Sequence, residues 1–392
     1  MPQALLHRFV AAALLAGAGS QSVMAQSAPA EPVDDVSTAD AGGEKAEASK
    51  KEGRFGKILP VPIFVTEPAI GEGLGAALVY FHKPPAEKPK LLTAETVTET
   101  ARRSKPPPTA TGIFAAYTNN GTQGAGIGHA RTMREDKYRL VAAAADLKVI
   151  TETFASDVPF EFQLKGAMGY ASIKRRFGDS QVFIGLSALA IDAAVDFRLD
   201  LGDEVPPPSL FGFDFQNYGL ALSAIYDGRD DTMMPSSGQL VDLTTWRYDD
   251  AFGSDFEYTT TRLKAHSFHQ WHDRFVMGFR LDVSTVGGEP PFFAVPYVSL
   301  RGIPALRYQG KTAGVVETEA RYQFSKRWAA IAFVGGGFTN TGNELQETQD
   351  DILAGGLGIR FKAIKQQNVW VGLDIARGPE DYAWYIQVGH PW

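Results

Sequence analysis

The sequence predicts an all-β protein, a transmembrane antiparallel β-barrel of about sixteen strands. Many segments alternate apolar and polar residues, as a strand does when its two faces meet different surroundings. Many of these segments run about ten residues or more, the length that a tilted strand needs to cross a bilayer. A soluble sheet protein would also alternate, but its strands usually run about 5–6 residues.

The composition narrows the function classes. The chain has 392 residues, a formal net charge of -7 and no cysteine. An acidic chain without a basic cluster argues against a nucleic-acid partner. Without cysteine there is no thiol redox chemistry and no thiolate metal site.

The N-terminus has the form of a secretory signal. His7 and Arg8 precede an apolar run from Phe9 to Ala18, and the small residues Val23 and Ala25 follow. The run is shorter than the roughly 20 apolar residues of a membrane-spanning helix. We predict a signal peptide over residues 1–25 with cleavage after Ala25, which directs the chain to a Gram-negative outer membrane.

Residues 26–53 are rich in Ala, Glu, Asp, Ser and Lys and carry almost no large apolar side chain. Such a segment cannot bury a core, so we expect a disordered periplasmic leader. The barrel is expected over residues 54–392.

Counting the alternating segments in order gives the expected strands. Their approximate starts are Ile58, Gly73, Thr111, Gly124, Tyr138, Phe160, Gln181, Phe215, Gln239, Tyr258, Phe275, Gly314, Trp328, Asp351, Asn368 and Tyr382. If the first strand rises from the periplasm, residues 199–213 and 287–311 are extracellular. The segment from Pro84 to Pro108 is then a long periplasmic connection. Charged residues in mid-strand favour a polar lumen over a packed interior.

The clearest alternation follows a loop with an Arg-Gly pair. Val316, Thr318, Ala320, Tyr322 and Phe324 share one face of the segment, and Glu317, Glu319, Arg321 and Gln323 share the other. Directly before it, Val298-Ser-Leu-Arg-Gly-Ile-Pro304 is too rich in Gly and Pro for a strand or helix. This order predicts a loop that folds back onto the acidic face of its own barrel.

The Arg-Gly loop and the strand after it resemble those of BamA/TamA-type outer-membrane assembly barrels, the bacterial surface antigen family. Further stretches are similar to the same family in the same order. They are Leu59-Pro-Val-Pro62 with Glu67-Pro68, residues 109–121, the turn carrying Asp227, Arg229, Asp230 and Gly238, and the closing segment Trp384–Trp392. The leader is too short for one of the POTRA modules that usually precede such barrels.

The resemblance implies roles for two sets of residues. Arg301 and Gly302 would lock the loop to the lumen, with Glu319 as first partner, Glu317 as second and Arg321 beside them. Trp384, Ile386, Val388 and Trp392 would form the insertion signal at the C-terminus. The family's thirteenth strand usually offers an aspartate to the loop arginine, but Gly335 stands at that position here.

The first and last strands are expected to form a weakly paired seam. Pro60 and Pro62 lie two apart, so their missing N–H groups point to the same neighbour. Gly389 and Pro391 weaken the last strand in the same way. An unpaired backbone group costs several kcal/mol in lipid, a cost that a plain pore has no reason to bear.

Other motifs favour ordinary structural readings. The glycines at 71–75 and 124–128 lack the strand–loop–helix context of a phosphate loop. His266 and His269 would face opposite sides of a strand, so the trio with His272 is not expected to hold a metal. Asp227, Asp230 and Asp231 could bind calcium, but capping of turn amides is the simpler role. We expect no catalytic residues, no cofactor and no metal site.

The resemblance implies insertion or translocation of proteins at the outer membrane, with outer-membrane lipid, the barrel assembly machinery and client polypeptides as partners. The alternative is a passive solute pore or an architectural barrel, since no client-receiving arm is evident. A soluble lipocalin-like binder is a third, more distant reading.

Overall fold

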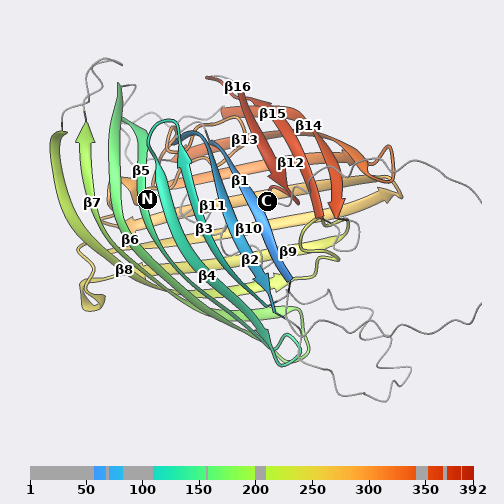
Figure 1. Ribbon diagram of the computed structural model, residues 1–392, viewed down its shortest axis with the longest axis horizontal. Helices are drawn as coiled ribbons and strands as arrows, with labels where there is room; N and C mark the ends of the chain where they lie inside the picture. The colour runs from blue at the N-terminus through green and yellow to red at the C-terminus, as the bar shows by residue number, and fades with distance from the viewer. Residues whose placement is uncertain are drawn as a thin grey trace, which may run out of the picture.

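The computed structural model describes residues 57–67, 70–82, 109–155, 158–198, 209–340, 352–364, 369–380 and 382–392. They form one antiparallel sheet in which every strand pairs with the next along the chain (Figure 1). The strands are β1 Lys57–Glu67, β2 Gly71–Phe81, β3 Ala110–Thr118, β4 Gln123–Met133, β5 Tyr138–Ala155, β6 Val158–Arg176, β7 Val182–Arg198, β8 Ser209–Asp227, β9 Gly238–Tyr248, β10 Tyr258–His272, β11 Phe275–Gly288, β12 Thr312–Tyr322, β13 Trp328–Asn340, β14 Ile352–Ile364, β15 Val369–Arg377 and β16 Tyr382–Val388.

The predicted fold class is confirmed, and the alternation located the strands well because each has one face in lipid. The start of β8 was the exception. It begins at Ser209, before the expected Phe215, so the connection before it is shorter than predicted. The signal peptide, the leader and the connection from Pro84 to Pro108 lie outside the described residues.

The outer surface of the sheet carries an apolar band. Its exposed members include Leu74, Leu78, Ile113, Ile127, Leu186, Leu220, Leu222, Leu243, Leu281, Val316, Val334, Leu353, Leu357 and Ile375. Large apolar residues on the convex face of a sheet are what a lipid-facing barrel wall requires. No helix within the described ranges is long and apolar enough to cross a bilayer.

The lengths of the connections orient the barrel. Both ends of the sheet, Lys57 and Val388, lie at the end where the connections after even-numbered strands turn back, and most of these are short. The connections after β7, β9 and β11, at the opposite end, are longer. Short turns face the periplasm in outer-membrane barrels, so we take the end with the chain termini as periplasmic.

The interior has two different walls, which corrects the expectation of a polar lumen. Over β1–β8 it is largely apolar, and Phe162, Leu164 and Met168 of β6 point inward. Lys165 of the same strand is exposed on the outside. Over β10–β15 the interior carries buried charges, among them Asp282, Glu317, Glu319, Arg321, Arg360 and Asp374.

The lengths of the four longest strands explain why charged side chains lie on the outer face here. β5 to β8 have 18, 19, 17 and 19 residues. A tilted strand needs only about 9–11 residues to span a bilayer, so these strands extend past it on the extracellular side. Asp146, Lys165 and Asp192 are exposed on the outer face of that extension, where water replaces lipid.

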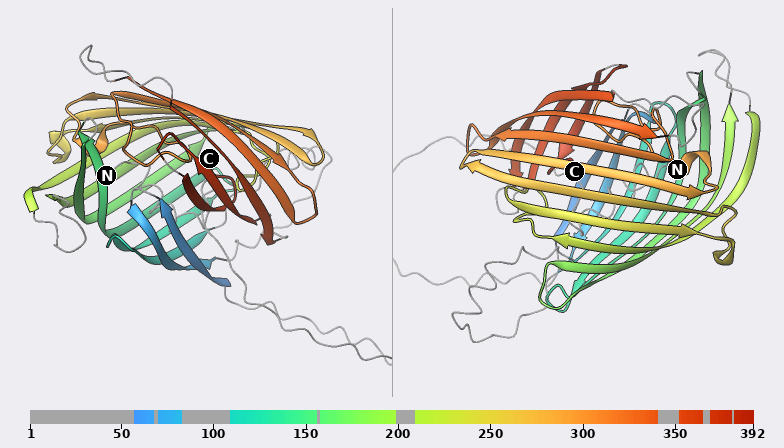
Figure 2. Two further views of the ribbon diagram at one scale, coloured as in Figure 1. Left: turned by 90° about the horizontal axis from the view of Figure 1, so that it is seen from above. Right: turned by 180° about the vertical axis from the view of Figure 1, so that it is seen from behind.

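The sheet has two edges, β1 and β16, which lie next to each other (Figure 2). Every consecutive pair of strands shares a ladder of paired residues. No ladder joins β1 to β16 within the described residues. We call this junction the seam.

Candidate functional site: a locked loop beside an unpaired seam

Residues 289–311, between β11 and β12, form a loop that folds into the barrel, and Arg301 is its anchor. Its Nη2 donates to Glu317 Oε1 at 2.6 Å and to Glu319 Oε2 at 2.8 Å. Its Nη1 donates to Asp374 Oδ2 of β15 at 2.9 Å. The guanidinium also lies 3.4 Å above the Phe333 ring of β13. One side chain therefore connects the loop to three strands.

The burial of these groups decides how strong the anchor is. The side chains of Arg301 and Glu317 are 5% and 0% exposed. A hydrated pair would contribute about 0–1 kcal/mol. Removing one partner of a buried pair instead costs about 3–5 kcal/mol, because the other charge is left uncompensated.

Gly302 lets the loop approach the wall closely. Its φ of 92° is in the region that L side chains rarely adopt. A Cβ on Gly302 would lie 3.0 Å from the backbone of Arg377 and Gly378. Its N–H donates to the hydroxyl of Tyr385 in β16 at 2.9 Å. The Arg-Gly pair therefore reaches the last strand, at the edge of the seam.

Further charged groups support the anchor. Arg280 of β11 donates to Glu317 Oε2 at 3.0 Å and to Asp282 Oδ2 at 3.1 Å. Arg360 of β14 makes a two-pronged contact with Asp374. Around the anchor, three carboxylates (Glu317, Glu319 and Asp374) thus face three guanidiniums (Arg280, Arg301 and Arg360). This balance lets charges persist in a buried site.

Sequence reasoning missed Asp374 as a partner of Arg301. It considered only Glu317 and Glu319, because Gly335 replaces the acidic residue on β13. A side chain does not fit at Gly335, since its Cβ would lie 2.8 Å from Leu300 Cδ1 and from Val316 O. Asp374 of β15 supplies a carboxylate to Arg301. The alternation of β15 placed Asp374 on the lumenal face, but only the path of the loop shows the contact.

The first part of the loop crosses to the opposite wall. Phe292 and Phe293 lie in the short 3-10 helix η3 Phe292–Ala294. The Phe292 ring lies 4.9 Å from Phe162 of β6, and the Phe293 ring 5.0 Å from Phe215 of β8. The loop thus spans the lumen from the apolar wall to the charged wall.

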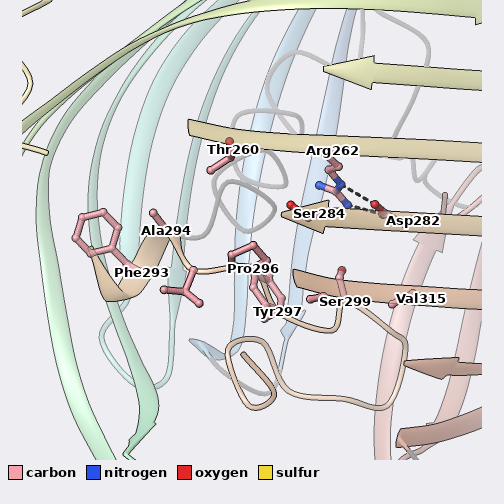
Figure 3. A pocket seen from close by; sticks show the side chains of 12 residues that line it. Thr260, Arg262, Asp282, Ser284, Phe293, Ala294, Pro296, Tyr297, Ser299 and Val315 are labelled. Carbon is pink, nitrogen blue, oxygen red and sulfur yellow. Dashed lines mark hydrogen bonds and ion pairs between the residues drawn. The ribbon is translucent and has the colours of Figure 1, made fainter. Parts of the chain in front are cut away.

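A small pocket of about 60 Å³ remains between the loop and the inner faces of β10, β11 and β12 (Figure 3). Arg262 lines it and is held by Asp282, with Nε donating to Oδ1 at 2.8 Å. A space of this size holds a few waters and no solute.

Arg321, which was predicted to lie beside the anchor, donates its hydrogen bonds to another part of the chain. Its Nη2 donates to Pro235 O at 2.7 Å and to Ser236 Oγ at 3.1 Å. Both belong to residues 228–237, the β8–β9 turn. Met234 of this turn is buried against Ala329 of β13 and Trp370 of β15. The turn therefore crosses beneath the charged wall and covers part of the periplasmic opening.

The aspartates of the β8–β9 turn organise its backbone. Arg229 Nε donates to Asp227 Oδ1 at 2.9 Å. Asp230 Oδ1 accepts amide hydrogens from Ser236 at 2.9 Å and from Ser237 at 3.1 Å. Gly238 closes the turn with a φ of 96°. These contacts use the carboxylates for capping of the kind that the simpler reading describes.

The C-terminal residues leave the sheet. Trp384 is exposed on the outer face of β16, in a strand that also holds Ile386 and Val388. Gly389, with a φ of 72°, turns the chain inward, and Pro391 follows. Trp392 is consequently buried in the lumen.

Two side chains hold this C-terminal tail. The Trp392 ring lies 5.7 Å from Phe268 of β10 in a stacked arrangement. His390 Nε2 lies 3.2 Å from Glu319 Oε1, and the His390 N–H donates to Met233 O at 2.7 Å. The tail thus contacts both the anchor of the loop and the β8–β9 turn.

His266 packs against Trp392, whereas His269 is exposed and bonds to Ser267, so these two histidines do not converge.

At the seam, Pro60 and Pro62 lie within β1, which pairs with β2 along its whole length. Among the described residues, a side-chain contact crosses the seam from Trp384 Nε1 of β16 to Glu72 Oε1 of β2 at 2.8 Å. This contact lies at the extracellular end of the junction.

Comparison with known proteins concerns the family and the fold. The model of the Omp85 superfamily domain matches residues 120–293. No curated protein matches the chain.

Several solved barrels have a similar fold. A crystal structure of BamA from Haemophilus ducreyi lacking POTRA domains 1-3 is 11% identical, with a TM-score of 0.56 over 85% of this chain and 70% of that one. CdiB from Acinetobacter baumannii is 11% identical, with a TM-score of 0.53, and the match covers 84% of this chain and 59% of that one. CdiB from Escherichia coli is 9% identical, with a TM-score of 0.57, and the corresponding shares are 84% and 62%. The chain therefore spans less than two thirds of either CdiB chain.

Proposed function

We propose that this chain, which belongs to the Omp85 superfamily of outer-membrane β-barrels, inserts or translocates polypeptides at the outer membrane through the seam between β1 and β16. The observation that carries the proposal is the missing ladder at that junction, next to continuous ladders everywhere else among the described strands.

The open edge of β1 has the chemistry to accept a client strand. Backbone groups at a sheet edge pair with any extended chain that reaches them, and alternate side chains then face lipid and lumen. In lipid each unpaired group costs several kcal/mol, which favours pairing with an incoming strand. Pro60 and Pro62 keep β1 from satisfying these groups by closing firmly on β16.

The two edges are held differently, which indicates which one moves. β16 is tied to the lumenal loop through Gly302 and Tyr385, and β15 through Arg301 and Asp374. β1 has its ladder to β2 and no comparable contact with the loop in the described residues. We therefore assign β1 as the mobile edge, with Arg301 acting as a positioning residue that keeps β15 and β16 in place.

The alternative is a passive pore or an architectural barrel. The loop that spans the lumen and the β8–β9 turn beneath it both oppose free passage of solutes. We also propose that the signal peptide is cleaved, that Trp392 is part of the insertion signal, and that the protein is not an enzyme.

Two measurements on the purified full chain separate these functions. In liposomes, the chain should accelerate the folding of a small urea-denatured outer-membrane barrel, seen as its heat-modifiable band. In planar bilayers it should show no steady conductance. Steady conductance without any acceleration of client folding would establish the pore instead.

A further inference from the structure

Polar residues cross the outer face of the barrel at the periplasmic end of β2, β3 and β4. Tyr80, Thr111 and His129 are paired in register across these strands, so their side chains share the outer face. Arg131 follows His129 by two residues and lies on the same face. His82, directly after β2, joins the group through its ring.

This polar row borders the apolar band. The next row toward the membrane consists of Leu78, Ile113 and Ile127, which are again paired in register. They are 50%, 51% and 51% exposed. Two residues along a strand span about 7 Å, so the change from apolar to polar is abrupt. The polar row therefore lies at the height of the headgroups of the periplasmic leaflet.

The histidines form a preorganised pair. His82 Nε2 lies 2.8 Å from Thr111 Oγ1, and the same hydroxyl lies 2.8 Å from His129 Nδ1. The two rings meet edge to face at 5.6 Å. Each ring thus has one nitrogen fixed by Thr111, which leaves His82 Nδ1 and His129 Nε2 to meet a ligand.

Among the described residues, the exposed arginines of this surface have no carboxylate partner. Arg131 of β4 and Arg175 of β6 are both exposed on the outer face, and neither forms an ion pair within the described residues. Of the two acids in the adjoining turn, Asp136 is 5% exposed and is occupied by Arg139 and Arg176, whereas Glu135 is exposed. The surface therefore offers hydrogen-bond donors and positive charge, and no described carboxylate is paired with Arg131 or Arg175.

The geometry points to a binding site for an anionic phospholipid of the periplasmic leaflet on the outer face of β2–β4. Arg131 and one histidine N–H would hold the phosphate, since a guanidinium fork matches phosphate oxygens. The Thr111 hydroxyl can donate to only one of the two rings, and that ring keeps an N–H for the phosphate. Leu78, Ile113 and Ile127 would contact the acyl chains. The site begins one strand away from β1 and so orders a lipid beside the seam. It does not depend on the handling of clients.

Native mass spectrometry of the full chain with phosphatidylglycerol tests this site. The parent should retain phosphatidylglycerol, and the variant His129→Gln/Arg131→Gln should lower the bound-to-free ratio roughly tenfold, as expected for lost charge-assisted hydrogen bonds. Lys165→Gln is the matched control, because it removes an exposed outer-face cation from the opposite end of the barrel. It should bind like the parent.

The heat-modifiable band shows whether each variant is assembled. If the double variant does not assemble, Arg131→Lys, which keeps the charge and removes the fork, should give an intermediate loss. Unchanged retention in the assembled variants would overturn the site. Equal retention of phosphatidylcholine, or displacement of phosphatidylglycerol by inorganic phosphate, would overturn its assignment to an anionic lipid.

Discussion

Arg301 Nη1 lies 2.9 Å from Asp374 Oδ2, which ties the loop between β11 and β12 to the second-last strand of the barrel. The two residues are 73 positions apart in the chain. Their contact supports the C-terminal edge of the sheet, and no described residue gives β1 at the other edge a comparable contact with the loop.

We expect Arg301→Met to release the loop. Glu317, Glu319 and Asp374 would keep their charges without their shared partner, at a cost of about 3–5 kcal/mol. Limited proteolysis of the assembled barrel should show faster cleavage within residues 289–311. Arg247→Met, which removes an exposed ion pair with Asp249, is the control and should leave cleavage unchanged. Equal cleavage of all three proteins would contradict the lock.

Restoring an acidic residue on β13 should damage this barrel. Gly335→Asp would collide with Leu300, and overpacking of this kind costs about 1–3 kcal/mol. Leu300→Ala in the same chain makes room and should recover part of the loss, with a coupling of about 0.5–3 kcal/mol. Denaturant titration of the parent, both single variants and the double variant measures it. Additive effects would show that Leu300 does not occupy the acidic position.

Much of this fold could be predicted from the sequence, because every second residue is apolar in a strand with one face in lipid. The difference between the two walls of the lumen could not be predicted. On β6 the apolar residues face inward, since its extracellular extension meets water on the outside. The route of the loop is also a tertiary property, so Asp374 could be placed on the lumenal face but not matched to Arg301. Trp392 ended in the lumen because Gly389 bends the chain.

Deleting Trp392 should lower the amount of assembled barrel in the outer membrane. The residue closes the chain with an aromatic ring and also packs on Phe268 in the finished barrel. Loss of the heat-modifiable band measures assembly. Phe268→Ala separates the two roles, because it removes the lumenal contact and keeps the C-terminal aromatic. Normal assembly after deletion of Trp392 would argue against an insertion signal.

The C-terminal tail should loosen in acid. Burial lowers the pKa of His390, an effect that Glu319 opposes and that Arg321 and Arg301 add to. Because its pKa lies below the unfolded value of about 6.5, the buried imidazole is neutral. The buried position of the tail is therefore fully stable above pH 6.5. As the pH falls below about 6.5 towards the lowered pKa, His390 in the released tail takes up a proton that the buried His390 does not, so release of the tail is favoured. Trp392 fluorescence should report the change, and His390→Gln should abolish its pH dependence. A pH-independent signal in the parent would contradict this account.

The most direct measurement closes the seam. The chain has no cysteine, so one pair can be introduced at Thr66 and Trp384 and joined by a short reducible crosslinker. These positions flank the seam, since Thr66 pairs with Glu72 and Glu72 contacts Trp384. Cysteines at Leu78 and Ile113, which pair between β2 and β3, provide the control crosslink. We predict that the seam crosslink stops the acceleration of client folding in liposomes, that reduction restores it, and that the control crosslink has no effect. Full acceleration with the seam crosslinked would contradict the central claim.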